Sequence, residues 1–274
     1  MSKGILYLVP TPIGNLGDIT YRAVEVLKSV DLIAAEDTRT SQKLLKHYDI
    51  KNKIISYHKF NERKQTKSLI DFLEQGKSIA VITDAGTPAI SDPASILVRA
   101  AIEAEIQVTC LPGATALIPA LAASGLDTNR FTFTGFLPAK KKDRTALLNA
   151  LKVFPHTIVL YESSHHILET VRELSAYFND RKFVLARELS KLYETIYRGH
   201  FTDLEFINNL ETRGEFVILI SGKVDTDVSD IELLELIEVN SGKWLSLKEL
   251  SSAISEKTGV SRNRIYKLAL DRKK

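Results

Sequence analysis

The stretch ITDAGTPAISDPA, residues 82–94, decides how the fold is interpreted. The apolar run from Ile79 to Thr83 is typical of a buried strand, and Asp84 ends it. A glycine, two prolines, a serine and a second aspartate follow within ten residues. Glycine lets a backbone approach a ligand closely, and proline stiffens the loop that presents it. The stretch therefore predicts a ligand-binding loop directly after a buried strand.

Two further glycine- and proline-containing loops follow apolar runs in the first half of the chain, at residues 9–18 and 111–120. Strand patterns at 4–9, 32–35, 53–57, 79–83 and 107–111 alternate with helical patterns at 18–30, 62–74, 93–104 and 113–123, and Asp18 is the expected N-cap of the first helix. Continuous apolar strands alternating with helices predict a mostly parallel sheet covered on both faces. In such sheets ligands bind beyond the carboxyl ends of the strands.

The pattern changes near residue 125, where a second α/β unit with a mixed sheet is expected. Its predicted strands are 131–136, 157–161, 183–186, 194–199 and 215–221, with helices at 142–153, 164–178 and 202–211. A polar linker and three short helical patterns at 229–239, 246–257 and 261–270 follow, the last two resembling a helix-turn-helix. The predicted domains are residues 1–124, 125–222 and 223–274.

Composition narrows the class of protein. The 274 residues are 44% hydrophobic and 26% charged, which is ordinary for a globular chain, and contain no apolar run long enough to span a membrane. The single cysteine, Cys110, excludes an internal disulfide, favours a cytoplasmic location and is expected to be buried in its apolar run. The net charge is only +3, but basic residues cluster at 58–67, 139–144 and 262–274, which favours a polyanionic partner.

Several common sites are disfavoured by their missing motifs. The first loop contains only Gly14 and Gly17, so the dinucleotide fingerprint is incomplete, and no P-loop is present. His165 and His166 are adjacent and would face different ways on a helix, and no cysteine cluster exists. We therefore expect no metal site.

Eight blocks in order resemble the class III, tetrapyrrole-methylase-like S-adenosylmethionine methyltransferases. They are PTPIGNLGDIT, AAEDTRTS, ITDAGTPAISDPA, LPGATALIPALAASGL, FTFTGFLP, VLYESSHHI, LARELSKLYETIYRG and GEFVILI, and they cover residues 4–222. The chain is most similar to those members that methylate a cytidine of 16S ribosomal RNA on its 2′-oxygen. The resemblance implies two α/β domains with S-adenosylmethionine bound in the cleft between them, a homodimer, and the assembled small ribosomal subunit as partner.

The resemblance also implies which residues contact the cofactor. They are Pro12, Ile13, Asp84, Gly86, Thr87, Ile90, Ser91, Ala114, Thr115, Tyr161, Leu185, Ala186, Glu215, Phe216 and Val217. Some relatives carry aspartate in a G-D-P loop where this chain has Thr87. Which polar group would bind the amino-acid end of the cofactor is therefore left open between Thr87 and the upstream Asp84.

Methyl transfer to a ribose hydroxyl calls for an acceptor held in line in a dry cleft, and a general base can assist. Candidates are the charged residues at predicted strand ends. We expect catalytic roles for Arg187, Glu188, Lys191 and Glu36, with domain-packing ion pairs as the alternative. A lysine could act as a base only if burial lowered its pKa.

RNA contacts are expected from the basic clusters and from Arg39, because Lys and Arg bind phosphates. The candidates are Arg39, His58, Lys59, Arg63, Lys64, Lys140, Lys141, Lys142, Arg144, Arg262, Arg264 and Lys267. Two other functions remain open from the residues alone: a methyltransferase for a small, tetrapyrrole-like molecule, and a nucleic-acid-binding regulator whose α/β part senses a nucleotide.

Overall fold

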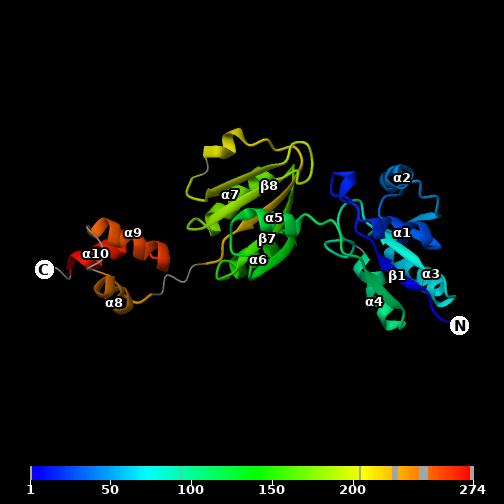
Figure 1. The fold of residues 1–274 in the computed structure, drawn as a ribbon, viewed down its shortest axis with the longest axis horizontal. Helices are drawn as coiled ribbons and strands as arrows, with labels where there is room; N and C mark the ends of the chain where they lie inside the picture. Colours follow the sequence, from blue (N-terminus) through cyan, green and yellow to red (C-terminus); the bar gives the residue numbers. More distant parts are fainter. Residues whose placement is uncertain (1, 93, 204, 224–227, 241–245, 272–274) are drawn as a thin grey trace.

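The computed structural model describes residues 2–92, 94–203, 205–223, 228–240 and 246–271, arranged as three units in a row (Figure 1). Residues 224–227 of the predicted linker and the basic residues 272–274 lie outside this described part. Within it, none of the helices is both long enough and apolar enough to cross a lipid bilayer.

The first unit contains a five-stranded sheet in which every pairing is parallel, in the order β3-β2-β4-β1-β5. The strands are β1 (Ile5–Leu8), β2 (Leu32–Ala35), β3 (Ile54–Ser56), β4 (Ile79–Ile82) and β5 (Gln107–Cys110). The parallel sheet predicted from the apolar runs is confirmed. Cys110 was expected to be buried but is exposed, because β5 is an edge strand.

Helices cover both faces of this sheet. On one face lie α1 (Tyr21–Ser29) and α2 (Thr38–His47), and on the other α3 (Glu62–Glu74) and α4 (Ala94–Glu103). The prediction that Asp18 caps the first helix is wrong. Asp18 ends the 3-10 helix η1 (Leu16–Asp18), and the Thr20 hydroxyl accepts a hydrogen bond from Ala23 N at the true start of α1. Helix α2, which begins after Asp37, was not predicted.

The second unit contains a mixed sheet in the order β6-β7-β10-β8-β9, in which only the β6–β7 pairing is parallel. Its strands are β6 (Phe131–Phe136), β7 (Thr157–Ser163), β8 (Lys182–Arg187), β9 (Thr195–His200) and β10 (Glu215–Ile220). Helices α6 (Lys141–Leu151) and α7 (Ile167–Tyr177) cover one face. The helix predicted at 202–211 is instead the 3-10 helix η2 (Glu205–Asn209).

The other face of the mixed sheet is covered by α5 (Leu117–Ser124), which precedes the predicted boundary at 124–125. Ala120 and Leu121 of this helix are buried against Val184 and Val217. Figure 1 shows α5 within the middle unit. By packing, α5 therefore lies with the second sheet, and the three domain ranges remain predictions.

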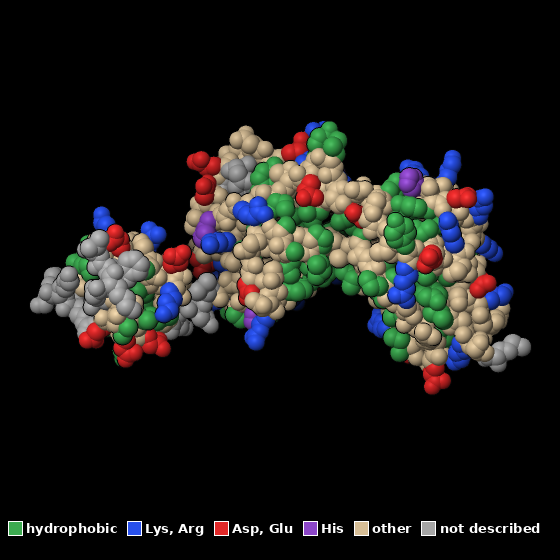
Figure 2. Space-filling model, in the orientation of Figure 1, with side chains coloured by type: hydrophobic (Ala, Val, Ile, Leu, Met, Phe, Trp, Pro, Cys, Tyr) green, Lys and Arg blue, Asp and Glu red, His purple; other side chains and the backbone are tan. Residues whose placement is uncertain are grey.

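The third unit consists of α8 (Asp230–Asn240), α9 (Leu247–Thr258) and α10 (Arg262–Asp271) around a small apolar core. The predicted capping box at the start of α9 is confirmed: Ser246 and Glu249 bond each other's backbone N–H groups. Gly259 ends α9 with a left-handed backbone. Figure 2 shows acidic side chains gathered along the α8 side of this unit.

Candidate functional site

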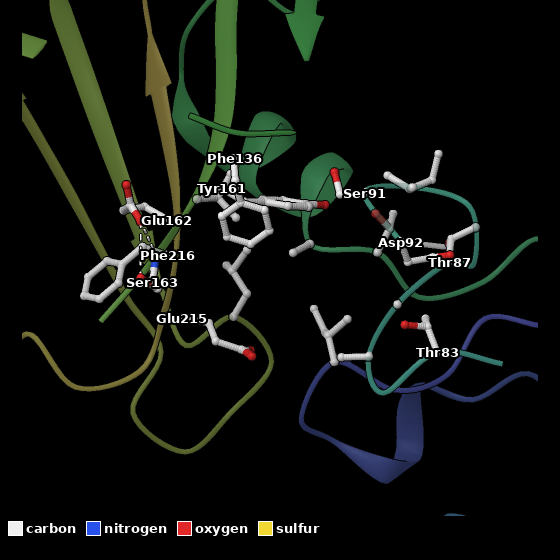
Figure 3. Close-up of a pocket in the computed structure, with 18 of the residues that line it drawn as sticks. Thr83, Thr87, Ser91, Asp92, Phe136, Tyr161, Glu162, Ser163, Glu215 and Phe216 are labelled. Carbon is white, nitrogen blue, oxygen red and sulfur yellow. Dashed lines mark hydrogen bonds between the residues drawn. The ribbon is translucent and has the colours of Figure 1, made fainter. Parts of the chain in front are cut away.

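A cavity of about 290 Å³ lies between the first two units. One wall comes from the loop between β4 and α4, which carries Thr83, Thr87, Ser91 and Asp92. The opposite wall comes from the strands of the mixed sheet. Figure 3 shows Phe136, Tyr161 and Glu215 facing this loop across the cavity.

The loop wall is tied to the other two glycine- and proline-containing loops. Gly86 exchanges backbone hydrogen bonds with Thr11 at 2.9 and 3.0 Å, and its φ of +85° favours glycine. The Thr87 hydroxyl donates to the carbonyl of Ala114 at 3.0 Å. The three loops that the sequence predicts at strand ends therefore meet at one edge of the parallel sheet.

The strand wall is built from side chains on β7, β8 and β10: Tyr161, Ala186 and Val217. The Tyr161 ring packs edge-on against Phe133 and Phe136, with ring centroids 4.9 and 5.7 Å away. Burial raises the pKa of Tyr161, while hydrogen bonding to Thr115 and to the Leu117 backbone opposes that shift. This wall is aromatic and apolar, as in most sites for small organic ligands.

Most residues that the resemblance implies for cofactor binding line this cavity. They are Ile13, Gly86, Thr87, Ile90, Ser91, Thr115, Tyr161, Ala186, Glu215, Phe216 and Val217. Pro12, Asp84, Ala114 and Leu185 are not among the lining residues. Leu185 is fully buried in the core beneath α6 and α7, because alternate residues of β8 face opposite sides of the sheet.

Three carboxylates lie near the loop wall. Glu36 lines the cavity and accepts hydrogen bonds from the Thr83 hydroxyl at 2.6 Å and from Asp84 N at 3.4 Å. Burial and the nearby Glu36 charge raise the pKa of Asp84, whose Oδ1 accepts from Asp37 N. Asp92 also lines the cavity, and burial raises its pKa. Its Oδ2 is buried and has no hydrogen-bond partner among the described residues.

Lys191 also lines the cavity, where its ammonium group bonds Glu188 Oε1 at 2.7 Å and Glu215 Oε2 at 3.0 Å. Burial disfavours the charged ammonium, but these two carboxylates outweigh burial and raise the pKa of Lys191. For Glu188, burial opposes ionisation, but Lys191 and the backbone N–H of Glu215 hold its pKa below the usual value. Lys191 is therefore charged at neutral pH and cannot accept a proton in this arrangement.

Arg187 and Glu188 do not line the cavity. Arg187 is buried and donates to the carbonyls of Arg213 at 2.7 Å and Tyr193 at 3.2 Å. It holds together the loops that follow β8 and precede β10. Of the four expected catalytic residues, the structure brings Glu36 and Lys191 to the cavity.

All the expected RNA-binding residues except His58 fall into two groups. The first is exposed and consists of Arg39, Lys59, Arg63, Lys64, Lys140, Lys141, Lys142, Arg262 and Lys267. His58 is half-buried, and its Nδ1 accepts from Phe60 N.

The second group is engaged with the protein itself. Arg144 pairs with Glu173 at 2.5 Å and donates to Thr170 at 2.9 Å, and Arg264 pairs with Asp230 at 2.7 Å. Arg39 is exposed but also bonds Asp37, whose pKa it lowers to about 2. Contacts of Arg144 or Arg264 with phosphate would compete with these carboxylates.

Sequence reasoning missed several cavity residues, including Thr83, Asp92, Phe136 and Leu189. Asp92 carried a usable signal, because an aspartate just before a helical pattern is a typical N-cap, and its Oδ1 accepts from Ala94 N at 2.7 Å. Phe136 carried none: a β-bulge at Gly135 aims it at the cavity, and bulges cannot be located from apolar alternation.

The cavity thus combines an apolar, aromatic wall with a loop of hydroxyl and carboxylate groups. Such a site suits an elongated ligand with an apolar centre and polar, charged ends. The described residues contain no cluster of three or more His, Cys, Asp or Glu side chains arranged to hold a metal ion. The expected absence of a metal stays a prediction.

Comparison with known proteins agrees with this architecture. The family described as Tetrapyrrole (Corrin/Porphyrin) Methylases matches residues 5–205. A protein named ribosomal RNA small subunit methyltransferase I, from Synechocystis sp., is 45% identical over 98% of both chains. Among solved structures, diphthine synthase superposes with a TM-score of 0.65 at 13% identity, covering 80% of this chain and 90% of its own.

A uroporphyrin-III C-methyltransferase from Thermus thermophilus, solved in complex with S-adenosylhomocysteine, gives a TM-score of 0.55 at 16% identity. It covers 80% of this chain and 97% of its own. These two structures share the fold of the first two units. The chain belongs to the tetrapyrrole methylase family, within the group of ribosomal RNA small subunit methyltransferase I proteins.

Proposed function

We propose that this protein transfers a methyl group from S-adenosylmethionine to the 2′-oxygen of a cytidine in 16S ribosomal RNA of the small ribosomal subunit. The observation that carries the proposal is the 45% identity over 98% of both chains to a relative named for that subunit. The family match ends at residue 205 and so does not reach the third unit. The similarity to this relative does include the third unit.

The character of the cavity walls suits S-adenosylmethionine. Ile13, Leu189 and Val217 offer apolar contacts for the adenine and thioether parts, and the loop after β4 offers polar groups. The buried, unpartnered Oδ2 of Asp92 is suited to accept a hydrogen bond from an ammonium group. Asp92 thus joins Thr87 as a candidate for the amino-acid end, whereas Asp84 lies outside the lining. Bound S-adenosylmethionine would supply an activated methyl group, with no metal required.

The acceptor hydroxyl needs orientation and a place for its proton. Glu36 is the one expected catalytic carboxylate that lines the cavity, and it could accept that proton. Lys191 is held as a cation and would contribute charge and position instead of accepting a proton. The apolar residues of the strand wall would help to exclude water from the reacting atoms once both substrates are bound.

RNA would be held by the exposed basic residues on each unit. Lys59, Arg63 and Lys64 lie at the start of α3, and Lys140–Lys142 lie at the start of α6. The logarithm of the RNA-binding constant should fall linearly with the logarithm of the salt concentration, and each phosphate contact that is lost should reduce the steepness of this line by about 1. Changing Lys140–Lys142 to glutamine should therefore flatten the salt dependence, whereas Arg144→Gln should not. Assembly as a homodimer is part of this proposal.

The test is transfer of labelled methyl from S-adenosylmethionine to small ribosomal subunits from cells that lack this gene, with mass spectrometry of the digested RNA. Label in 2′-O-methylcytidine supports the proposal. Label absent from RNA while calorimetry detects cofactor binding would overturn the RNA substrate and direct the search to small-molecule acceptors. Loss of cofactor binding altogether would overturn the assignment of the cavity.

A further inference from the structure

Backbone strain in this protein is concentrated at the cavity. Six described residues other than glycine have positive φ angles: Asp49, Ala89, Ser91, Glu105, Glu188 and Ser190. Asp49 and Glu105 lie just beyond the ends of α2 and α4, where a left-handed residue is a common helix terminator. The other four have no such local explanation. Ala89 and Ser91 lie in the loop after β4, and Glu188 and Ser190 in the loop after β8.

Each strained loop touches the opposite unit. Ser91 of the first unit lies against Gly135 of β6, where an added Cβ would come within 2.9 Å of the Ser91 Oγ. Gly135 itself has a φ of +67° at the β-bulge. At this rim a strained serine therefore packs into space that only glycine leaves, next to Phe136 (Figure 3).

The second contact repeats this arrangement with the units exchanged. The Ser190 hydroxyl of the second unit donates to the Asp18 carboxylate of the first. The adjacent Lys191 crosses Gly14, where an added Cβ would come within 2.3 Å of the Lys191 Cγ. Gly14 has a φ of +148° and follows the cavity residue Ile13. Both rims thus join a strained serine loop to a glycine of the other unit.

We propose that Ser190 is a positioning residue whose hydrogen bond to Asp18, together with the packing of Ser91 on Gly135, clamps the two α/β units at two rims of the cavity and so sets the width of the cleft. The inference rests on the proposed methyl transfer, because the width of the cleft sets how far the donor held by one unit lies from an acceptor held by the other. A misplacement of about 1 Å can lower the rate of a reaction about 100-fold. Strained backbone persists only where the surrounding structure holds it in place. The contacts between the two units at these rims would hold the two serine loops in their strained conformations.

The test compares Ser190→Ala, Asp18→Ala and Asp18→Asn, because an asparagine side-chain oxygen can still accept from Ser190. We expect kcat for methyl transfer to fall about 10-fold in Ser190→Ala and Asp18→Ala, with the cofactor Kd within about 2-fold of the unaltered protein. Asp18→Asn should keep most of the rate. The double variant should lose no more than either single variant, since both remove one contact. Ser175→Ala is the matched control, because among the described residues that hydroxyl bonds only within its own helix, to the carbonyl of Arg172.

A second readout follows the units themselves and needs no substrate. Spin labels at Lys43 on α2 and Asn149 on α6, in a Cys110→Ser background, report the distance between the first two units. All three of these residues are exposed. The clamp predicts a broader distance distribution in Ser190→Ala and Asp18→Ala than in Ser175→Ala. Equal distributions together with unchanged kcat would overturn it. If the unaltered protein methylates no ribosomal RNA but the distributions still broaden, the proposed function fails and the clamp stands.

Discussion

The two α/β units line the same cavity with different kinds of structure, one with a loop and the other with strands. The first contributes a loop at the edge of a parallel sheet, where Gly86 and Thr87 are held by hydrogen bonds to neighbouring loops. The second contributes strand residues, where Tyr161, Ala186 and Val217 are part of a packed sheet. Substitutions in the strand wall should therefore disturb folding as well as binding, whereas substitutions in the loop wall should act mainly on binding.

The largest effect is expected where the strand wall offers least room. Ala186 is 1% exposed and lines the cavity, so Ala186→Phe would place a ring in the ligand space. Cofactor affinity by calorimetry should fall at least about 1,000-fold, or ~4 kcal/mol. Ala186→Ser is the control at the same position and should bind within about 10-fold. Normal binding by Ala186→Phe would show that the cofactor does not contact this wall.

The next effect separates folding from binding on the same wall. Tyr161→Ala removes a ring that packs against Phe133 and Phe136, and should lower the free energy of unfolding by about 3 kcal/mol. Tyr161→Phe keeps the ring and should cost less than about 1 kcal/mol. Urea denaturation measures both. Equal losses in the two variants would mean that the hydroxyl, and not the packing, stabilises the wall.

The loop wall should respond in the opposite way. Thr87→Val keeps the shape but removes the hydrogen bond to the Ala114 carbonyl, which ties two loops together. We expect cofactor affinity to fall about 5-fold, or ~1 kcal/mol, with a melting temperature within about 2 °C of the unaltered protein. A drop in melting temperature as large as that of Tyr161→Ala would break the contrast between the two walls.

The smallest effect concerns the charged loop after β8. The folded state lowers the pKa of Glu188 from its ordinary value of 4.5, so its ionisation stabilises the fold above about pH 4.5. That contribution is lost as pH falls through the lowered pKa. Glu188→Gln should therefore be less stable at pH 7 by about 1 kcal/mol or less, because the pair is partly exposed to solvent. Thermal unfolding between pH 7 and pH 3 should show the two proteins converge in acid. A gap that persists at pH 3 would assign the effect to packing.

Local sequence patterns predicted most of the helices and strands, because each of these elements has its own periodicity of apolar residues. The runs at 32–35 and 131–136 and the helix at 62–74 coincide with β2, β6 and α3. Glycine and proline marked the loops that meet at the cavity, since these residues interrupt helices and strands whatever their tertiary surroundings. Helix α2 was missed because polar residues dominate TRTSQKLLKH, and only a narrow apolar stripe, including Leu44 and Leu45, is buried.

The residues of the candidate site were also predicted only in part. The resemblance pointed to Thr87, Tyr161 and Val217, which line the cavity. It also pointed to Leu185, which faces the core, because the strand register that turns a side chain inward or outward is set by pairing with β9 and β10. The place of Phe136 beside Tyr161 and the contact of Lys191 with Glu215 depend on groups distant in the sequence.

Local sequence patterns specify the two strand-and-helix units, the loops at the strand ends and the three terminal helices, because apolar periodicity, caps and turn residues act over a few neighbours. Long-range packing places α5 on the second sheet and pairs Arg144 with Glu173. The same packing brings Ser91 to Gly135 and Ser190 to Asp18. Those contacts join residues far apart in the chain, and their geometry exists only once both sheets have formed and packed.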